Sequence, residues 1–175
     1  MSEPTEMPSF SRSLKADDLG AEPYSVELHA AEADLAGIAQ YLMIPGVDAM
    51  RGEADVTRRG DLITVSGRVE ATLVRECVAT LEPMEELIDE DFVATFTTSA
   101  PDADDLRDEV EADLDAPEPL ENDRLDMGAV FLEHVVLSMA PHPRRQNAEP
   151  IPDPGAGVRI SAFDALKALK TGDDD

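Results

Sequence analysis

The residues best suited to acid–base or metal chemistry are Glu133 and His134, which are neighbours in an apolar segment. A His-Glu-x-x-His zinc motif needs a second histidine one helical turn away, and the sequence has none at that spacing. Neighbouring residues on a helix also point about 100° apart, so these side chains would not converge on one substrate atom. We therefore favour a hydrogen-bonded pair at the end of a core helix over a catalytic pair.

The single cysteine, Cys77, excludes an intramolecular disulfide and a multi-cysteine zinc site. It lies in a β-favouring run, where a packed small hydrophobic side chain is commoner than a reactive thiol. The glycines stand singly, no Walker loop occurs, and the acidic segments lack the Asp-x-Asp-x-Asp-Gly loop of a calcium site. We expect a protein that is not an enzyme and has no cofactor, no metal site and no small-molecule substrate.

Negative charge dominates the composition, because 39 Asp and Glu residues outnumber 14 Lys and Arg residues and give a formal net charge of −25. Nucleic-acid binding normally gains from protein cations that displace counterions, so this charge disfavours a broad RNA-binding face. Basic polypeptides, by contrast, would be attracted. Solubility at high salt is an alternative reason for the same charge.

The sequence has no signal of a membrane or secreted protein. Residues 1–20 contain no apolar run after a basic start, and no stretch of about 18 apolar residues occurs. We expect a cytoplasmic protein without membrane contact.

The periodicity of apolar residues predicts an α+β fold in a single domain over residues 23–172. Alternation with a period of two predicts an antiparallel sheet of about four strands, over residues 24–28, 50–58, 62–80 and 86–98. Helical spacing predicts a short N-terminal helix over residues 31–43, a buried helix over 125–140, and a C-terminal helix with Phe163, Leu166 and Leu169 on one face.

The remaining segments have the composition of loops. Residues 1–22 are expected to form a flexible N-terminal arm, although Phe10 and Leu14 could dock locally. An acidic, partly disordered loop is expected at about residues 99–124, because its charge is high and its apolar content is low. Residues 173–175 form an acidic tail.

Three stretches, residues 67–83, 125–143 and 163–170, carry motifs that occur in the same order in a known family. They resemble parts of the YceD family, the large ribosomal RNA subunit accumulation proteins. In the first, Gly67 to Pro83 (GRVEATLVRECVATLEP), a strand leads into Cys77, which is followed six residues later by Pro83. Many relatives read Cys-x-Arg-Cys there, whereas this chain has Thr80 in place of the second cysteine. A metal or redox role attached to paired cysteines therefore does not carry over.

The other two stretches follow in the same order. Leu125 to Pro143 (LDMGAVFLEHVVLSMAPHP) is similar to a family helix with an early Asp, a central Glu and closing prolines, and Phe163 to Lys170 (FDALKALK) is similar to the closing helix. The family-like positions are Cys77, Leu81, Glu82, Pro83, Asp126, Glu133, Leu137, Pro141, Pro143, Phe163, Leu166 and Leu169.

The resemblance implies a non-enzymatic role in synthesis, processing or stability of large-subunit (23S) ribosomal RNA. Together with the charge, it leads us to expect a basic ribosomal or ribosome-assembly protein as the partner, with ribosomal RNA contacted indirectly. Arg75, Arg144 and Arg145 are candidate contacts to the partner or to RNA, because they are cations near family-like positions. The alternatives are an acidic mimic of nucleic acid, a general protein-interaction module, and an enzyme that uses Glu133 and His134.

Overall fold

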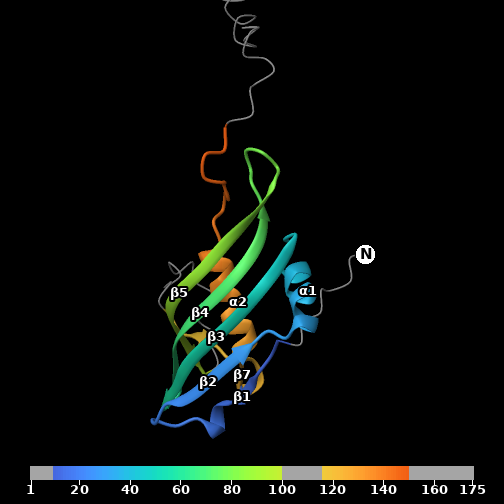
Figure 1. The fold of residues 1–175 in the computed structure, drawn as a ribbon. Helices are drawn as coiled ribbons and strands as arrows, with labels where there is room; N and C mark the ends of the chain where they lie inside the picture. The colour runs from blue at the N-terminus through green and yellow to red at the C-terminus, as the bar shows by residue number, and fades with distance from the viewer. Residues whose placement is uncertain (1–9, 100–115, 150–175) are drawn as a thin grey trace, which may run out of the picture.

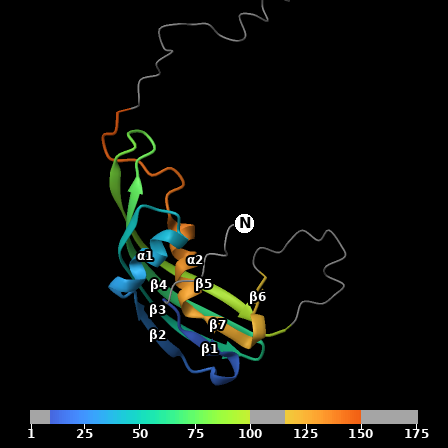
Figure 2. The ribbon, with the colours of Figure 1, turned by 90° about the vertical axis from the view of Figure 1, so that its right-hand side faces the viewer.

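The computed structural model of this chain describes residues 10–99 and 116–149. A five-stranded sheet forms the centre of the described part, and one of its faces carries two α-helices and a two-stranded sheet (Figures 1 and 2). The opposite face carries no other described helix or strand, and we call it the open face (Figure 2).

The large sheet has the order β2-β3-β4-β5-β6, in which β5 and β6 are parallel and the other neighbours are antiparallel. Its strands are β2 (Tyr24–His29), β3 (Gly46–Arg59), β4 (Leu62–Glu76), β5 (Pro83–Thr97) and β6 (Glu118–Pro119). The other elements are β1 (Ser13–Lys15), which pairs with β7 (Arg124–Asp126), the helices α1 (Glu32–Tyr41) and α2 (Met127–Ser138), and the 3-10 turns η1 (Ala16–Asp18) and η2 (Glu121–Asp123).

The hairpin of β3 and β4 forms because apolar and polar residues alternate along both strands. In β4, Ile63, Val65 and Val69 are fully buried on the helix side, whereas residues between them, such as Arg68, lie on the open face. Gly60 joins the two strands with a φ of 65°, a left-handed conformation that glycine adopts without strain.

The core lies between α2 and the large sheet. Phe131, Leu132 and Val135 of α2 are buried, and the Phe131 ring meets the Phe92 ring of β5 edge to face, with centroids 6.1 Å apart. Gly52 of β3 permits this close packing, because a Cβ atom there would lie 2.4 Å from the Phe131 ring.

The predicted fold class is wrong. The described part is mainly β, and its large sheet has five strands with mixed pairing instead of about four antiparallel strands. The missed strand, β6, lies inside the predicted acidic loop and has no apolar pattern; it is held beside β5 by a 2.8 Å hydrogen bond from Leu120 N to Thr97 O. The predicted C-terminal helix lies outside the described residues.

Residues 10–19, which the sequence assigned to a flexible arm, are packed against the body. Strand β1 pairs with β7, and the side chains of Phe10, Leu14 and Leu19 are buried in the core. The local docking of Phe10 and Leu14 is thus confirmed. The rest of the predicted loop and tail, residues 100–115 and 173–175, is outside the described residues.

The two helices are short. Neither α1 nor α2, the α-helices of residues 10–99 and 116–149, is long and apolar enough to cross a bilayer.

Candidate functional site

Two family-like stretches that are far apart in the sequence meet at the end of the β4–β5 hairpin. The turn over residues 77–82 lies against the segment that follows α2, where Val78 N donates a 2.9 Å hydrogen bond to Pro143 O. Arg145 N donates to Cys77 Sγ across the same contact, at 3.4 Å. We call residues 75–86 together with residues 139–145 the hairpin tip.

The turn itself is closed by its own backbone. Cys77 N donates to Glu82 O at 2.9 Å, and Leu81 N donates to Cys77 O at 2.8 Å. Leu81 has a φ of 58°, which is uncommon for a residue with a bulky side chain, and its side chain is 68% exposed. Such a conformation persists only where surrounding bonds hold it, and here they do.

Arg75 and Glu86 form an ion pair beneath the turn. Arg75 Nη1 lies 2.7 Å from Glu86 Oε2, and only 13% and 11% of the two side chains are exposed. Glu86 Oε1 also accepts a 2.6 Å hydrogen bond from Ala140 N, and Arg75 Nη2 donates to Ala140 O at 3.3 Å. The pair thus fastens the end of α2 to the hairpin, and Arg75 is not open to a partner or to RNA.

The two following arginines are also engaged. Arg145 forms an ion pair with Glu82, and Arg144 Nη2 donates to Ala148 O at 2.9 Å. Both side chains remain exposed, so they retain some capacity for outside contacts. Arg75, Arg144 and Arg145, the three cations proposed from the sequence, therefore all bond to groups within the protein.

Cys77 is fully buried just after β4 ends, as expected of a packed residue. Hydrogen bonding to the Thr80 side chain, and then to the N–H of Arg145, lowers the pKa of Cys77 to about 7. Thr80 is the residue that occupies the place of the second family cysteine. A hydroxyl therefore supplies a polar partner to the one thiol, and burial keeps that thiol away from solvent.

Asp126 is a structural residue at the start of α2. Its Oδ1 accepts hydrogen bonds from Gly128 N at 2.9 Å and from Arg12 N at 3.2 Å, and its Oδ2 accepts one from Ser11 Oγ at 2.6 Å. The side chain thus caps the helix and fixes the N-terminal segment to it.

The expected hydrogen-bonded pair of Glu133 and His134 does not form. Glu133 is exposed, whereas the His134 ring stacks on the Phe92 ring with centroids 3.9 Å apart. Burial lowers the pKa of His134. The two side chains point to different surroundings, so they do not combine into an acid–base site.

Helix α2 is buried on one face only, in contrast to the predicted fully buried helix. Val136 and Leu137 are 48% and 70% exposed. The sequence suggested complete burial because apolar residues occur all round the helix.

Other family-like positions lie at the ends of secondary-structure elements or outside the described residues. Pro83 begins β5 opposite Glu76, and Pro141 follows the end of α2. Phe163, Leu166 and Leu169 lie outside the described residues. Glu86 was missed, and its only signal was a carboxylate on the inward phase of a strand.

In the described part of the chain, no group of three or more His, Cys, Asp or Glu side chains is arranged so that it could hold a metal ion.

Comparison with known proteins supports the resemblance seen in the three stretches. The family model described as "Large ribosomal RNA subunit accumulation protein YceD" matches residues 65–170, a range that contains all three stretches. No curated protein matches the chain. No solved structure matches it.

Proposed function

This chain belongs to the YceD family of large ribosomal RNA subunit accumulation proteins, which implies a role in accumulation of that RNA, and we propose that it acts there by binding a basic protein of the assembling subunit. The proposed activity is non-enzymatic. The basic partner supplies positive charge that the protein itself lacks.

The observation that carries this proposal is the charge of the open face. Because directly opposed residues of antiparallel strands share a face, the strand register gives its composition. Its carboxylates include Glu27, Glu53, Asp55, Glu70, Glu76, Glu85, Asp89 and Asp91, and its arginines are Arg51, Arg59 and Arg68.

Two of the three arginines of the open face, Arg51 and Arg68, are already paired with carboxylates. Arg51 makes two hydrogen bonds to Glu70, of 2.7 and 2.6 Å, and Arg68 lies 2.5 Å from Asp89 and 3.1 Å from Asp91. The carboxylates remain in excess, so the face attracts cations.

Two carboxylates of this face lie directly opposite each other on neighbouring strands. Glu27 and Glu53 are directly opposite each other across β2 and β3, and like charges in that position are destabilising. His29 Nε2 lies 2.8 Å from Glu27 Oε1 and Arg68 lies opposite Glu53, so part of this repulsion is already offset. A lysine or arginine from a partner would reduce the repulsion that remains. A phosphate backbone would increase it, which favours a protein over RNA as the direct contact.

An acidic mimic of nucleic acid is the second candidate. The open face presents its carboxylates on a rigid sheet, which a mimic of phosphate groups requires, whereas the sequence had suggested that most acidic residues lie in a loop. A mimic would bind a nucleic-acid-binding protein, and added RNA would compete with it.

A pull-down from lysate with the tagged full chain tests the proposal. We expect large-subunit proteins to be recovered at low salt, to remain after nuclease treatment, and to be lost as salt rises. Glu27→Gln with Glu53→Gln should lower recovery, and the control Glu32→Gln with Glu121→Gln, two exposed acids outside this face, should not. Loss of all large-subunit material after nuclease treatment would contradict protein binding and favour RNA contact.

A further inference from the structure

Strand β5 has an unpaired outer edge for most of its length. It is 15 residues long, and the only described strand that pairs with it on the side away from β4 is β6, which lies opposite Phe96 and Thr97 (Figure 2). From Pro83 to Thr95, no strand of the described residues lies against this edge.

The hydrogen bonds at the two ends of β5 show which of its residues have backbone N–H and C=O groups that point away from β4. Cys77 N donates to Glu82 O and Thr98 N donates to Asp61 O, so even-numbered residues of β5 bond to β4. Thr97 O instead accepts from Leu120 N on the outer side. Because the N–H and C=O groups of one residue point the same way in an antiparallel pair, the outward residues are Glu85, Leu87, Asp89, Asp91, Val93 and Thr95.

The same six residues carry their side chains on the open face. Leu87 and Val93 are 69% and 68% exposed, and they lie on either side of Asp89 and Asp91. The edge therefore offers free backbone groups together with a pattern of apolar, acidic, acidic and apolar side chains at every second residue.

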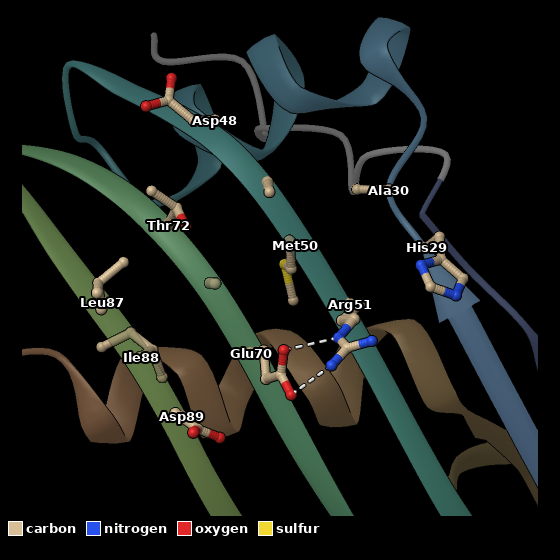
Figure 3. Close-up of a pocket in the computed structure, with 12 residues that line it drawn as sticks. His29, Ala30, Asp48, Met50, Arg51, Glu70, Thr72, Leu87, Ile88 and Asp89 are labelled. Carbon is tan, nitrogen blue, oxygen red and sulfur yellow. Dashed lines mark hydrogen bonds and ion pairs between the residues drawn. The ribbon is translucent and has the colours of Figure 1, made fainter.

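A hollow of about 460 Å³ lies on the open face next to this edge. Figure 3 shows Leu87 and Asp89 on one side of it and the hydrogen-bonded Arg51 and Glu70 towards its centre. The hollow has room for the aliphatic part of a long cationic side chain, whose charged end would then reach Glu70.

The charge of the edge selects among possible occupants. Natural edges are usually protected by lysines, prolines, bulges or short length, and β5 is long, pairs with β4 without a register shift, and has a proline only at its start. A second copy of β5 would bring carboxylates against Asp89 and Asp91. A cationic strand would instead form favourable cross-strand pairs with them.

We propose that the outer edge of β5 binds an extended, cationic segment of the partner protein as an added strand. The segment places lysine or arginine opposite Asp89 and Asp91 and apolar residues opposite Leu87 and Val93, and its backbone bonds to the outward N–H and C=O groups. This inference rests on the proposed function for the basic character of the partner, and adds the surface and the mode of binding.

The probe for a test is the synthetic peptide Thr-Val-Thr-Lys-Thr-Lys-Thr-Val-Thr. Its control has the same side chains and charge but carries methyl groups on the backbone nitrogens of its valines and lysines, which removes the N–H groups that would bond to β5. We expect the first peptide to bind the full chain and the methylated peptide to bind far more weakly. Equal binding would mean simple charge attraction and would overturn the proposal.

Amide exchange measured by NMR gives a second readout. In the free protein, the amides of Leu87, Asp89 and Asp91 should exchange quickly, while those of Ile88 and Phe92 should be protected by β4. With the peptide at about ten times its Kd, the outward amides should slow by about tenfold. Unchanged exchange at these amides in the bound state would contradict strand addition.

A pair of variants separates the backbone contribution from charge. Val93→Pro removes one outward N–H and leaves the bonds to β4 intact, whereas Val93→Thr keeps that N–H. We expect the proline variant to bind the peptide about tenfold more weakly, which corresponds to about one hydrogen bond, and the threonine variant to bind like the wild type. Equal affinity of the two variants would count against the edge.

The same variants distinguish this inference from the proposed function. If Val93→Pro recovers large-subunit proteins from lysate as well as Val93→Thr does, the edge is not the binding surface while protein binding itself stands. If the wild type recovers none after nuclease treatment although the peptide binds normally, strand addition stands and the proposed function fails.

Discussion

The hairpin tip and the outer edge of β5 share one strand, but within the described part of the chain the polar groups of the tip are hydrogen-bonded and the outward backbone groups of the edge are not. At the tip, Arg75, Glu86 and the backbone of the turn are bonded to one another and to the end of α2. Along the edge, the outward backbone groups of Leu87 to Val93 have no bonding partner among the described residues. The difference indicates that the polar groups of the hairpin tip stabilise the fold, while the surface available for binding comes from the order of the strands.

The largest expected effect is at the tip. Arg75→Ala would leave the largely buried Glu86 carboxylate without its counter-charge, and we expect the free energy of unfolding to fall by about 3 kcal/mol, as measured by urea denaturation. The matched control is Arg51→Ala, which breaks an exposed arginine–glutamate pair on the open face and should lower the free energy of unfolding far less, because solvent screens that pair. Equal losses in the two variants would mean that the tip is not specially dependent on its ion pair.

A smaller loss is expected at the start of α2. Asp126→Ala removes the cap and the bonds to the N-terminal segment, and should lower the free energy of unfolding by about 1–2 kcal/mol. Asp126→Asn keeps a side-chain oxygen that can accept from Gly128 N and should retain much of the stability. If the asparagine variant is as unstable as the alanine variant, capping is not the role of this residue.

Variants of the β5 edge should change binding of the cationic peptide more than they change stability. Asp89→Asn with Asp91→Asn should change the free energy of unfolding by only about 0.5 kcal/mol, since both residues are exposed. Binding of the cationic peptide should nevertheless weaken and lose part of its salt dependence. A large loss of stability with unchanged peptide binding would reverse the assignment of the two regions.

The smallest expected effect is the pH dependence of stability caused by His134, which belongs neither to the hairpin tip nor to the β5 edge. Burial lowers the pKa of His134 in the folded protein, so as pH falls below about 6.5 the unfolded chain takes up the proton first and this residue reduces stability. His134→Phe keeps a ring against Phe92 without the titration. Denaturation across this pH range should therefore show a steeper decline for the wild type than for the variant, and parallel curves would contradict it.

Local patterns in the sequence were sufficient for some elements and silent on others. Alternating residues located β4, and the apolar run located α2, because both signals are set by neighbours in the chain. Strand β6 and the packing of residues 10–19 depend on contacts with distant parts of the chain, and Glu118 and Pro119 carry no pattern that would reveal a strand.

The candidate site shows the same division. The sequence identified Cys77 and Arg145 as family-like or cationic positions, but not that they touch, since their contact requires the return of the chain after α2. The free edge of β5 depends on which strand lies last in the sheet. Strand order is not encoded in the local alternation of Leu87, Asp89, Asp91 and Val93.

The most direct test is rescue of large-subunit ribosomal RNA in cells that lack this protein. Val93→Thr should restore the RNA to the wild-type level, whereas Val93→Pro, present at the same level and equally folded, should not, because it lacks an outward N–H of the β5 edge. Full restoration of the RNA by Val93→Pro would contradict binding at this edge as the basis of the protein's function.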